Sequence, residues 1–449
     1  MNTLRVTGGR VLRPDGRVTD SDVTIDRDAG TILAVGEETE DGVGADAAGA
    51  DGAEADATAP DETLDATGSL VIPGLVNAHT HAAMTLLRGY ADDKPLDAWL
   101  QEDIWPVEAA LTPDDIEAGA ALGVLEMIRS GTTAFADMYF AMDRVADVVD
   151  RAGVRARLGH GVVTVGKDEA DARADVEESL AVAEDLDGAA DGRIRTAFMP
   201  HSLTTVGEEY LRDGIAAARE AGVPVHLHAN ETTDEVDPIV EGRGERPIAY
   251  AEDLDALGPT DFFAHGVHLD GAEIETLADA GTAIVHCPAS NMKLASGMAP
   301  VQRLREAGVT VALGTDGAAS NNDLDLFDEM RDAAMLGKLA ADDAAAVPAA
   351  AAVEMATAGG AEALGLPGGR IEPGAAADLA VVDLDAPHLT PVHDPVSHLA
   401  YAAHGSDVRH TVCDGQVLMR DREVLTLDAG RVQERAEDAA HDLVERVDG

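Results

Sequence analysis

Both ends of the chain alternate apolar and polar residues with the period of β-strands. Residues 4–36 show this alternation, interrupted by Gly-Gly, Pro-Asp-Gly and Asp-Ala-Gly sequences that are typical of turns. The pattern returns in residues 378–425, where Asp414-Gly415 marks a hairpin turn. We therefore expect a small β-sandwich-like domain assembled from both termini, residues 1–69 and 366–449.

The middle segment, residues 70–365, has a different rhythm, in which short apolar or β-branched runs alternate with helical patterns. Most intervals between the runs are long enough for a helix. Eight strand–helix units favour an α/β fold, a (β/α)₈ TIM barrel, over a doubly wound open sheet. The candidate strands are residues 70–78, 132–140, 155–163, 193–200, 223–229, 261–267, 282–288 and 309–316.

Residues 112–130 carry the clearest helix signal of the middle segment. Thr112 is a suitable N-cap, and Pro113 fits the first helical position. Apolar residues recur on one face, and Gly131 follows the last turn.

Composition and charge describe the surface rather than the fold. The 449 residues include 85 Asp and Glu against 32 Lys and Arg, a formal charge of −53. Such a surface repels phosphate, so we expect no nucleic-acid or membrane partner. The composition is typical of halophilic proteins, because molar salt shortens the Debye length to about 3 Å. Residues 41–67 form an acidic low-complexity tract, predicted to be a solvated loop.

Cysteines and hydropathy indicate the compartment. Cys287 and Cys413 are too few and too far apart for a disulfide framework or a cysteine-based zinc site. The N-terminus has no apolar signal segment, and no stretch approaches about 18 continuous apolar residues. We therefore expect a cytoplasmic protein without a membrane span.

Histidines and carboxylates fall at the ends of the predicted barrel strands, where functional groups of a parallel barrel lie. His79 and His81 follow the first run, His228 ends the fifth, and Asp316 ends the eighth. Residues i and i+2 of an extended segment face the same side, so His79 and His81 can reach one ion. Three imidazoles and one carboxylate favour Zn²⁺, with Fe²⁺ or Mn²⁺ as alternatives.

Further candidate groups lie close to this set. Glu231, three residues after His228, is placed to shuttle protons near a metal, although a helix-capping Glu is the structural alternative. His226 lies two residues before His228 and competes with it as a ligand, but the spacing to Glu231 favours His228. Three more histidines end strands: His201, His265 and His286.

Residues 161–168 partly match a phosphate-binding loop. The sequence GVVTVGKD has the two glycines and Lys167, but Asp168 replaces the Ser or Thr hydroxyl that a phosphate-bound Mg²⁺ requires. The charge of Asp168 would also repel phosphates, so we reject a nucleotide-triphosphate site.

Several segments together resemble the amidohydrolase superfamily. They are residues 71–89, which include the His-Thr-His sequence, and residues 288–294, 314–322 and 371–379. Within that superfamily the chain is similar to 5′-methylthioadenosine/S-adenosylhomocysteine deaminases, which are related to triazine chlorohydrolases. The resemblance implies hydrolytic deamination of 5′-methylthioadenosine, S-adenosylhomocysteine or 5′-deoxyadenosine to the inosine analogue and ammonia.

The resemblance also implies the roles of individual residues. His79, His81, His228 and Asp316 match the metal ligands. The resemblance implies that Glu231 transfers protons, that Asp316 takes the water proton, and that His265 holds the attacking water or the purine. Binuclear members use a carboxylated lysine near the fourth strand, where this chain has none of its four lysines, so one ion is expected.

Substrate contacts are implied in the same way. Glu108 matches a residue that accepts hydrogen bonds from ribose hydroxyls, and His201 matches a substrate-contacting histidine. Members that bind the homocysteine carboxylate use two arginines; His160 stands at one of those positions, and Arg173 is a candidate for the second.

Two alternatives stay open from the sequence. One is a related amidohydrolase that acts on a guanine-type heterocycle or a chlorinated triazine. The other is a non-catalytic metal-binding paralogue. A homo-oligomer is compatible with the sequence, which does not specify the assembly.

Overall fold

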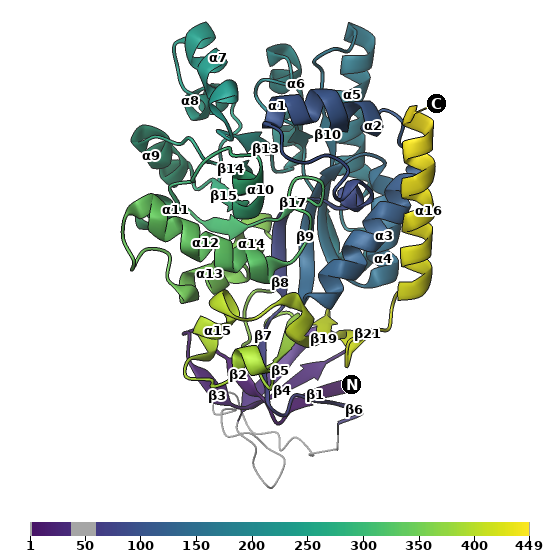
Figure 1. Cartoon of the computed structure of the whole chain (residues 1–449), viewed down its shortest axis with the longest axis vertical. Coiled ribbons are helices and arrows are strands. Elements are labelled where there is room, and N and C mark those ends of the chain that lie inside the picture. The colour runs from purple at the N-terminus through teal and green to yellow at the C-terminus, as the bar shows by residue number, and fades with distance from the viewer. Residues whose placement is uncertain (1, 37–59, 449) are drawn as a thin grey trace.

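Short parallel strands from the middle of the chain lie side by side around a ring, and helices cover the outside (Figure 1). The computed structural model describes residues 2–36 and 60–448. The ring is the predicted (β/α)₈ barrel. Its strands are β8 (Leu75–His81), β9 (Thr132–Tyr139), β10 (Arg155–Val162), β11 (Ile194–Thr196) with β12 (Met199–Pro200), β13 (His226–Ala229), β14 (Phe262–His265), β15 (Ala283–His286), and β16 (Val311–Leu313) with β17 (Asp316–Gly317).

Two junctions close the ring between its sheet segments. On either side of β12 the chain forms isolated parallel bridges with the segment of β13, between Phe198 and Val225 and between Ser202 and His228. β17 pairs in parallel with β8, and Asp316 lies opposite Thr80 in this register. Because all of these strands run in one direction, their carboxyl ends form a single rim.

Helices follow most strands, as the sequence pattern predicts. In the described part of the chain, no helix is long and apolar enough to cross a bilayer. The larger helices around the barrel are α3 (Pro113–Arg129), α4 (Met142–Ala152), α5 (Glu169–Asp185), α6 (Glu208–Ala221), α7 (Thr233–Arg243), α8 (Pro247–Asp253), α9 (Gly271–Ala280), α12 (Leu326–Ala341), α13 (Ala349–Met355) and α14 (Ala358–Leu364).

Helix α3 confirms the clearest local prediction. Thr112 is its N-cap, and the Thr112 side chain accepts a hydrogen bond from the Asp115 backbone N–H. The Asp115 carboxylate accepts in return from the Thr112 N–H at 2.8 Å, which completes a capping box. Local sequence therefore determines where this helix begins.

The two ends of the chain build two sheets that share a core. A four-stranded sheet has the order β5-β4-β1-β6, and a seven-stranded sheet has the order β21-β20-β19-β18-β7-β2-β3. Apolar side chains from both sheets pack together, among them Leu4, Ile25, Val71, Val381 and Val412. The strands are β1 (Thr3–Thr7), β2 (Arg10–Leu12), β3 (Val18–Asp20), β4 (Asp22–Asp26), β5 (Thr31–Gly36), β6 (Glu62–Asp65), β7 (Ser69–Pro73), β18 (Leu379–Asp383), β19 (Val408–Cys413), β20 (Gln416–Arg420) and β21 (Glu423–Val424).

The predicted first barrel strand, residues 70–78, is in fact divided between the two parts of the molecule. Its first half is β7, which pairs with β18 and β2, and its second half begins β8 of the barrel. Gly74 separates them, and a Cβ at this position would lie 2.2 Å from Thr133 Oγ1. An apolar run cannot reveal this division, because both halves are buried and differ only in their partners.

The expected loop over residues 41–67 differs from the structure at its C-terminal end. Residues 41–59 lie outside the described residues. Residues 62–65 form β6, which pairs in parallel with β1. Leu64 and Ala66 are buried, as expected for alternate residues of a strand. The C-terminal end of this tract is therefore a strand, although its composition is typical of a loop.

The last helix, α16 (Ala429–Asp448), lies within the residues expected to form the β domain but packs along α3 of the barrel (Figure 1). Arg435 donates to Glu117 at 3.1 Å, and Arg446 donates to Asp115. Leu443 and Ala436 are buried. The chain therefore returns to the barrel after completing the sheets.

Arg155 connects the barrel to the terminal sheets. From β10, its Nε donates to Asp378 Oδ2 at 2.8 Å and its Nη2 donates to Asp414 Oδ1 at 2.8 Å. The Asp414 N–H also donates to Asp378 Oδ1. The Asp378 side chain is 1% exposed, so this charge depends on Arg155 for compensation.

We expect Arg155→Ala to destabilise the protein by about 3–5 kcal/mol, because it leaves the buried Asp378 carboxylate without its guanidinium. Arg195→Ala is the matched control: Arg195 pairs with Asp187 while both side chains are about half exposed, and such pairs contribute about 0–1 kcal/mol. Denaturant unfolding in molar KCl measures both. Equal effects of the two substitutions would contradict the structural role of Arg155.

Candidate active site

A cavity of about 520 Å³ opens at the carboxyl rim of the barrel. One wall is apolar and comes from the segment after β8, including Leu96, Trp99, Leu100 and Trp105. The polar groups are His81, Glu108, His201, His228, Glu231, His265 and Asp316. The cavity thus combines an apolar wall with titratable groups, as is typical of small-molecule sites.

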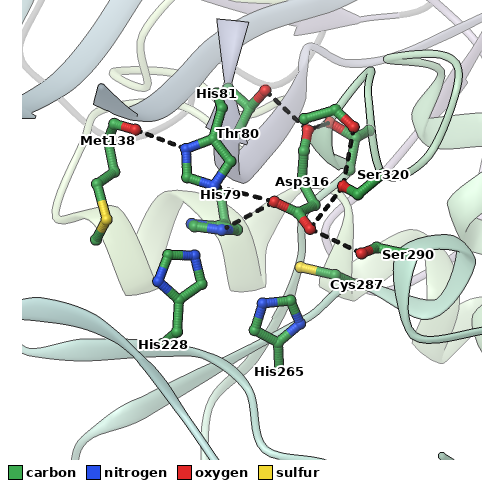
Figure 2. Close-up of polar contacts among 12 residues, drawn as sticks. His79, Thr80, His81, Met138, His228, His265, Cys287, Ser290, Asp316 and Ser320 are labelled. Carbon is green, nitrogen blue, oxygen red and sulfur yellow. Dashed lines mark hydrogen bonds and ion pairs between the residues drawn. The ribbon is translucent and has the colours of Figure 1, made fainter. Parts of the chain in front are cut away.

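Four predicted metal ligands converge in this cavity (Figure 2). One ligand atom from each of these residues lies within 4.8 Å of the others; they are His79, His81, His228 and Asp316. Three of the four residues are buried, and the His81 side chain is 12% exposed. Asp316 Oδ1 is 3.1 Å from His81 Nε2 and 3.5 Å from His79 Nε2. Pairing of β17 with β8 brings Asp316 to His79 and His81, and His228 reaches them from β13.

Backbone carbonyls orient two of the imidazoles. The His81 Nδ1–H donates to the Met138 carbonyl at 2.6 Å, and the His228 Nδ1–H donates to the His201 carbonyl at 2.7 Å. A neutral imidazole that donates through Nδ1 presents a lone pair at Nε2. Both rings are therefore in the tautomer that a divalent ion requires.

The Asp316 carboxylate is held on its other oxygen. Oδ2 accepts hydrogen bonds from Ser290 Oγ at 2.7 Å and from Ser320 Oγ at 2.8 Å (Figure 2). Burial raises the pKa of Asp316, but the adjacent imidazoles of His79 and His81 outweigh burial and hold the pKa well below its usual value. Oδ1 is left to face the imidazoles as an ionised ligand.

The donor set fits a divalent ion. Within the described residues, His79 Nε2 is buried and has no hydrogen-bond partner, although it points toward the Asp316 carboxylate. A buried, unpaired imidazole nitrogen is costly unless a cation occupies the space before it. Three nitrogens and one carboxylate oxygen suit a single Zn²⁺.

Glu231 and His265 face each other beside this cluster. Glu231 Oε2 lies 3.7 Å from His265 Nε2, and Ser296 Oγ donates to Glu231 Oε1 at 3.3 Å. Burial raises the pKa of Glu231, which favours its protonated form. His265 Nδ1 lies 2.9 Å from Asn291 Oδ1, so its Nε2 is the atom directed at Glu231.

Three residues at these strand ends have left-handed backbone conformations, which residues other than glycine rarely adopt. They are His265 at φ 74°, Asp316 at φ 61° and Asn230 at φ 53°. Strained backbone of this kind concentrates at functional sites, where the surrounding structure enforces it. Of the three, His265 and Asp316 line the cavity, whereas the Asn230 side chain donates to Glu273.

His201 and Glu108 also line the cavity. The His201 ring centre is 4.6 Å from that of His228, and its Nδ1 lies 2.9 Å from Thr205 Oγ1. Glu108 ends the short helix α2 (Trp105–Glu108), and its Oε1 accepts from the Tyr139 hydroxyl at 2.7 Å. Burial raises the pKa of Glu108 to about 7. Sequence reasoning missed Tyr139, which is one of several residues in a uniformly buried strand.

The structure does not bring His160 and Arg173 to the cavity. His160 Nε2 pairs with Asp175 at 3.1 Å behind the lining, and the Arg173 side chain is 49% exposed beside Glu169. Neither residue lines the cavity, so the expectation that these two contact substrate stays a prediction without support from the cavity lining. Among the described residues that line the cavity, Lys167 is the one Lys or Arg, and its Nζ is 2.8 Å from Asp175 Oδ2.

His226, which begins β13, and His286, which ends β15, are not among the residues that line the cavity. His226 lies behind His79, with its Nε2 2.8 Å from His79 Nδ1. The competition between His226 and His228 for the ion is thus decided geometrically, because His226 meets the side of His79 that points away from Asp316.

Comparisons with known proteins agree with this site. Residues 70–418 match the amidohydrolase family. A 5-methylthioadenosine/S-adenosylhomocysteine deaminase of Halobacterium salinarum is 68% identical over 446 residues, 99% of each chain. A 5′-deoxyadenosine deaminase of Methanosarcina mazei is 47% identical over 425 residues, 95% of this chain and 97% of the relative.

Among solved structures, a zinc-bound adenosine deaminase from Xanthomonas campestris has a TM-score of 0.88 and 37% identity, with 98% of each chain covered. Its barrel fold and bound zinc are consistent with the cluster of three histidines and one aspartate described above. The family match spans most of the chain and includes all four of these residues. This chain therefore belongs to the amidohydrolase family.

Proposed function

We propose that the protein is a metal-dependent deaminase that converts a 5′-substituted adenosine and water to the inosine analogue and ammonia. The observation that carries this proposal is the buried Glu231 carboxyl, which faces His265 beside the three-histidine, one-aspartate cluster. The relatives named above are deaminases of adenosine or its derivatives, which supports the same reaction.

The base in this reaction is Asp316. A divalent ion, zinc above all, would be held by His79, His81, His228 and Asp316 and would supply a Lewis acid that makes hydroxide available near neutral pH. Asp316 is ionised, so its carboxylate can take the proton of the attacking water. Ser290 and Ser320 keep the carboxylate in one orientation while it does so.

The acid is Glu231. Burial raises the pKa of its carboxyl, which favours the protonated form, and this form donates its proton to the ring nitrogen next to the amino-bearing carbon and makes that carbon more electrophilic. His265, across from Glu231, orients the water that adds to this carbon. The new C–O bond forms, the proton taken by Asp316 passes to the amino group, and the C–N bond breaks to release ammonia. The proton of the new hydroxyl returns to Glu231 as the carbonyl of the product forms, which restores both carboxyl groups.

Glu108 and His201 are the substrate contacts that the cavity supports. The Glu108 carboxylate lies in the cavity wall and can accept hydrogen bonds from ribose hydroxyls, while the Tyr139 hydroxyl holds its Oε1. The apolar residues Trp99 and Trp105 provide surface for a neutral 5′ substituent. Cytoplasmic location and homo-oligomer formation stay predictions.

A panel of 5′-substituted adenosines, assayed in molar salt with metal analysis of the same sample, tests the proposed function. We expect loss of adenosine-type ultraviolet absorbance with one ammonia released per nucleoside. Chloride release from a chlorotriazine without nucleoside turnover would instead support the related hydrolase. No turnover of either class in zinc-loaded protein would support the non-catalytic alternative.

Glu231→Gln should retain zinc and lose turnover by about 10²–10⁴-fold, because glutamine keeps the shape but cannot donate a carboxyl proton. Initial rates and zinc content are measured on the same preparation. Glu241→Gln, an exposed position on α7, removes the same charge nearby and should leave the rate unchanged. A near-normal rate for Glu231→Gln would remove Glu231 from the mechanism.

The KM for the nucleoside should rise as pH falls through about 7, because the raised pKa of Glu108 means that its carboxylate is lost in this range. Glu108→Gln should raise KM about tenfold, in line with a lost charged hydrogen bond, and abolish this dependence. Tyr139→Phe should move the KM profile to higher pH, since the Tyr139 hydroxyl lowers the pKa of Glu108. An unchanged KM profile in Glu108→Gln would contradict the assigned contact.

Lys167→Met should lower kcat/KM for S-adenosylhomocysteine about tenfold, because Lys167 is the lining cation that can meet a substrate carboxylate. The same variant should keep kcat/KM for 5′-methylthioadenosine within about twofold, since that substrate has no carboxylate. Arg173→Ala is the matched control outside the cavity and should change neither value. Equal losses for both substrates in Lys167→Met would indicate a structural effect instead.

A further inference from the structure

A chain of hydrogen bonds passes from the backbone of β14 through His226 to His79. His226 Nδ1 lies 2.7 Å from the Phe262 carbonyl oxygen, and His226 Nε2 lies 2.8 Å from His79 Nδ1. The His226 side chain is fully buried, and its ring stacks on Phe262 with centres 4.2 Å apart. His226 therefore has one defined position and a polar partner on each ring nitrogen.

The partners of His226 determine which nitrogens carry hydrogen. The Phe262 carbonyl can only accept, so the hydrogen of a neutral His226 lies on Nδ1 and its Nε2 has a lone pair. That lone pair accepts from the Nδ1–H of His79. The Nε2 of His79 is then also a lone pair, and it is the nitrogen that faces Asp316.

His79 differs from the other two histidines of the cluster in how it is oriented. His81 and His228 donate directly to backbone carbonyls, whereas His79 Nδ1 meets a side chain. The carbonyl of Phe262 thus acts on His79 through the intervening ring of His226. Partners of this kind commonly set the tautomer and the affinity of a metal-binding histidine.

We propose that His226 is a positioning residue that sets the tautomer and ring orientation of His79 and thereby strengthens divalent-metal binding. The proposal deepens the metal site of the proposed function and does not depend on which substrate is deaminated. His226 is not itself a ligand in this arrangement, because both of its nitrogens are already hydrogen-bonded and its Nε2 meets the side of His79 that points away from Asp316.

The test measures zinc affinity by competition with a chelator, using purified full-length His226→Phe, His226→Gln and His286→Phe. His226→Phe keeps an aromatic ring beside Phe262 but leaves His79 Nδ1 without an acceptor, so we expect affinity to fall about 10–100-fold. His226→Gln supplies an amide oxygen that can accept from His79 and should recover most of the loss. His286→Phe removes another buried histidine, which ends β15 outside the cavity lining, and should stay within about twofold of the parent.

Two results would overturn the proposal: zinc affinity of His226→Phe within about twofold of the parent, or equal losses in His226→Phe and His286→Phe. Thermal unfolding of the metal-free variants identifies any that fail to fold, and His226→Leu then replaces His226→Phe in the comparison. Because the readout is metal affinity, failure of the deaminase proposal in the nucleoside assay would leave this result interpretable.

Discussion

The pairing of β17 with β8 is the contact on which the site depends. Asp316 lies opposite Thr80, between the two histidines of the His-Thr-His segment, and Thr80 Oγ1 donates to the Asp316 carbonyl. The same strand pairing therefore closes the barrel and brings the Asp316 carboxylate, near the C-terminal end of residues 70–365, to His79 and His81 near the N-terminal end. A buried carboxylate at this position requires compensation, which comes from two serine hydroxyls, the imidazoles and the ion that the cluster is built to hold.

The cavity above the cluster is built by segments outside the ring. Glu108 and the tryptophans come from the connection between β8 and α3, and Lys167 comes from the connection between β10 and α5. The candidate metal ligands and the proposed proton-transfer groups thus lie at or just after strand ends, whereas the proposed substrate contacts Glu108 and Lys167 lie on longer connections. This division explains how amidohydrolases with a similar metal set can differ in substrate, because loops vary without disturbing the ring.

The predictions that held were those that rest on local periodicity or on short spacing. Thr112 and Asp115 form a capping box within one turn, and His79 and His81 share a face because they are two residues apart. The predictions that failed needed partners far along the chain. The sequence pattern predicts one strand over residues 70–78 and places α16 in the β domain, because neither segment carries a local sign of what it packs against.

The sequence by itself determined the alternation of strands and helices, the positions of the candidate ligands at strand ends, and the acidic surface, because each follows from residue type and spacing. Only the tertiary structure decided which histidine joins the cluster and which one meets the far side of His79. His226 and His228 are two residues apart on the same strand. His226 accepts a hydrogen bond from His79, whereas His228 joins the cluster. The physical reason is the direction in which each ring nitrogen points. The same nitrogen lone pair can accept a hydrogen bond or bind a metal ion, and the packing around the ring determines which of the two it meets.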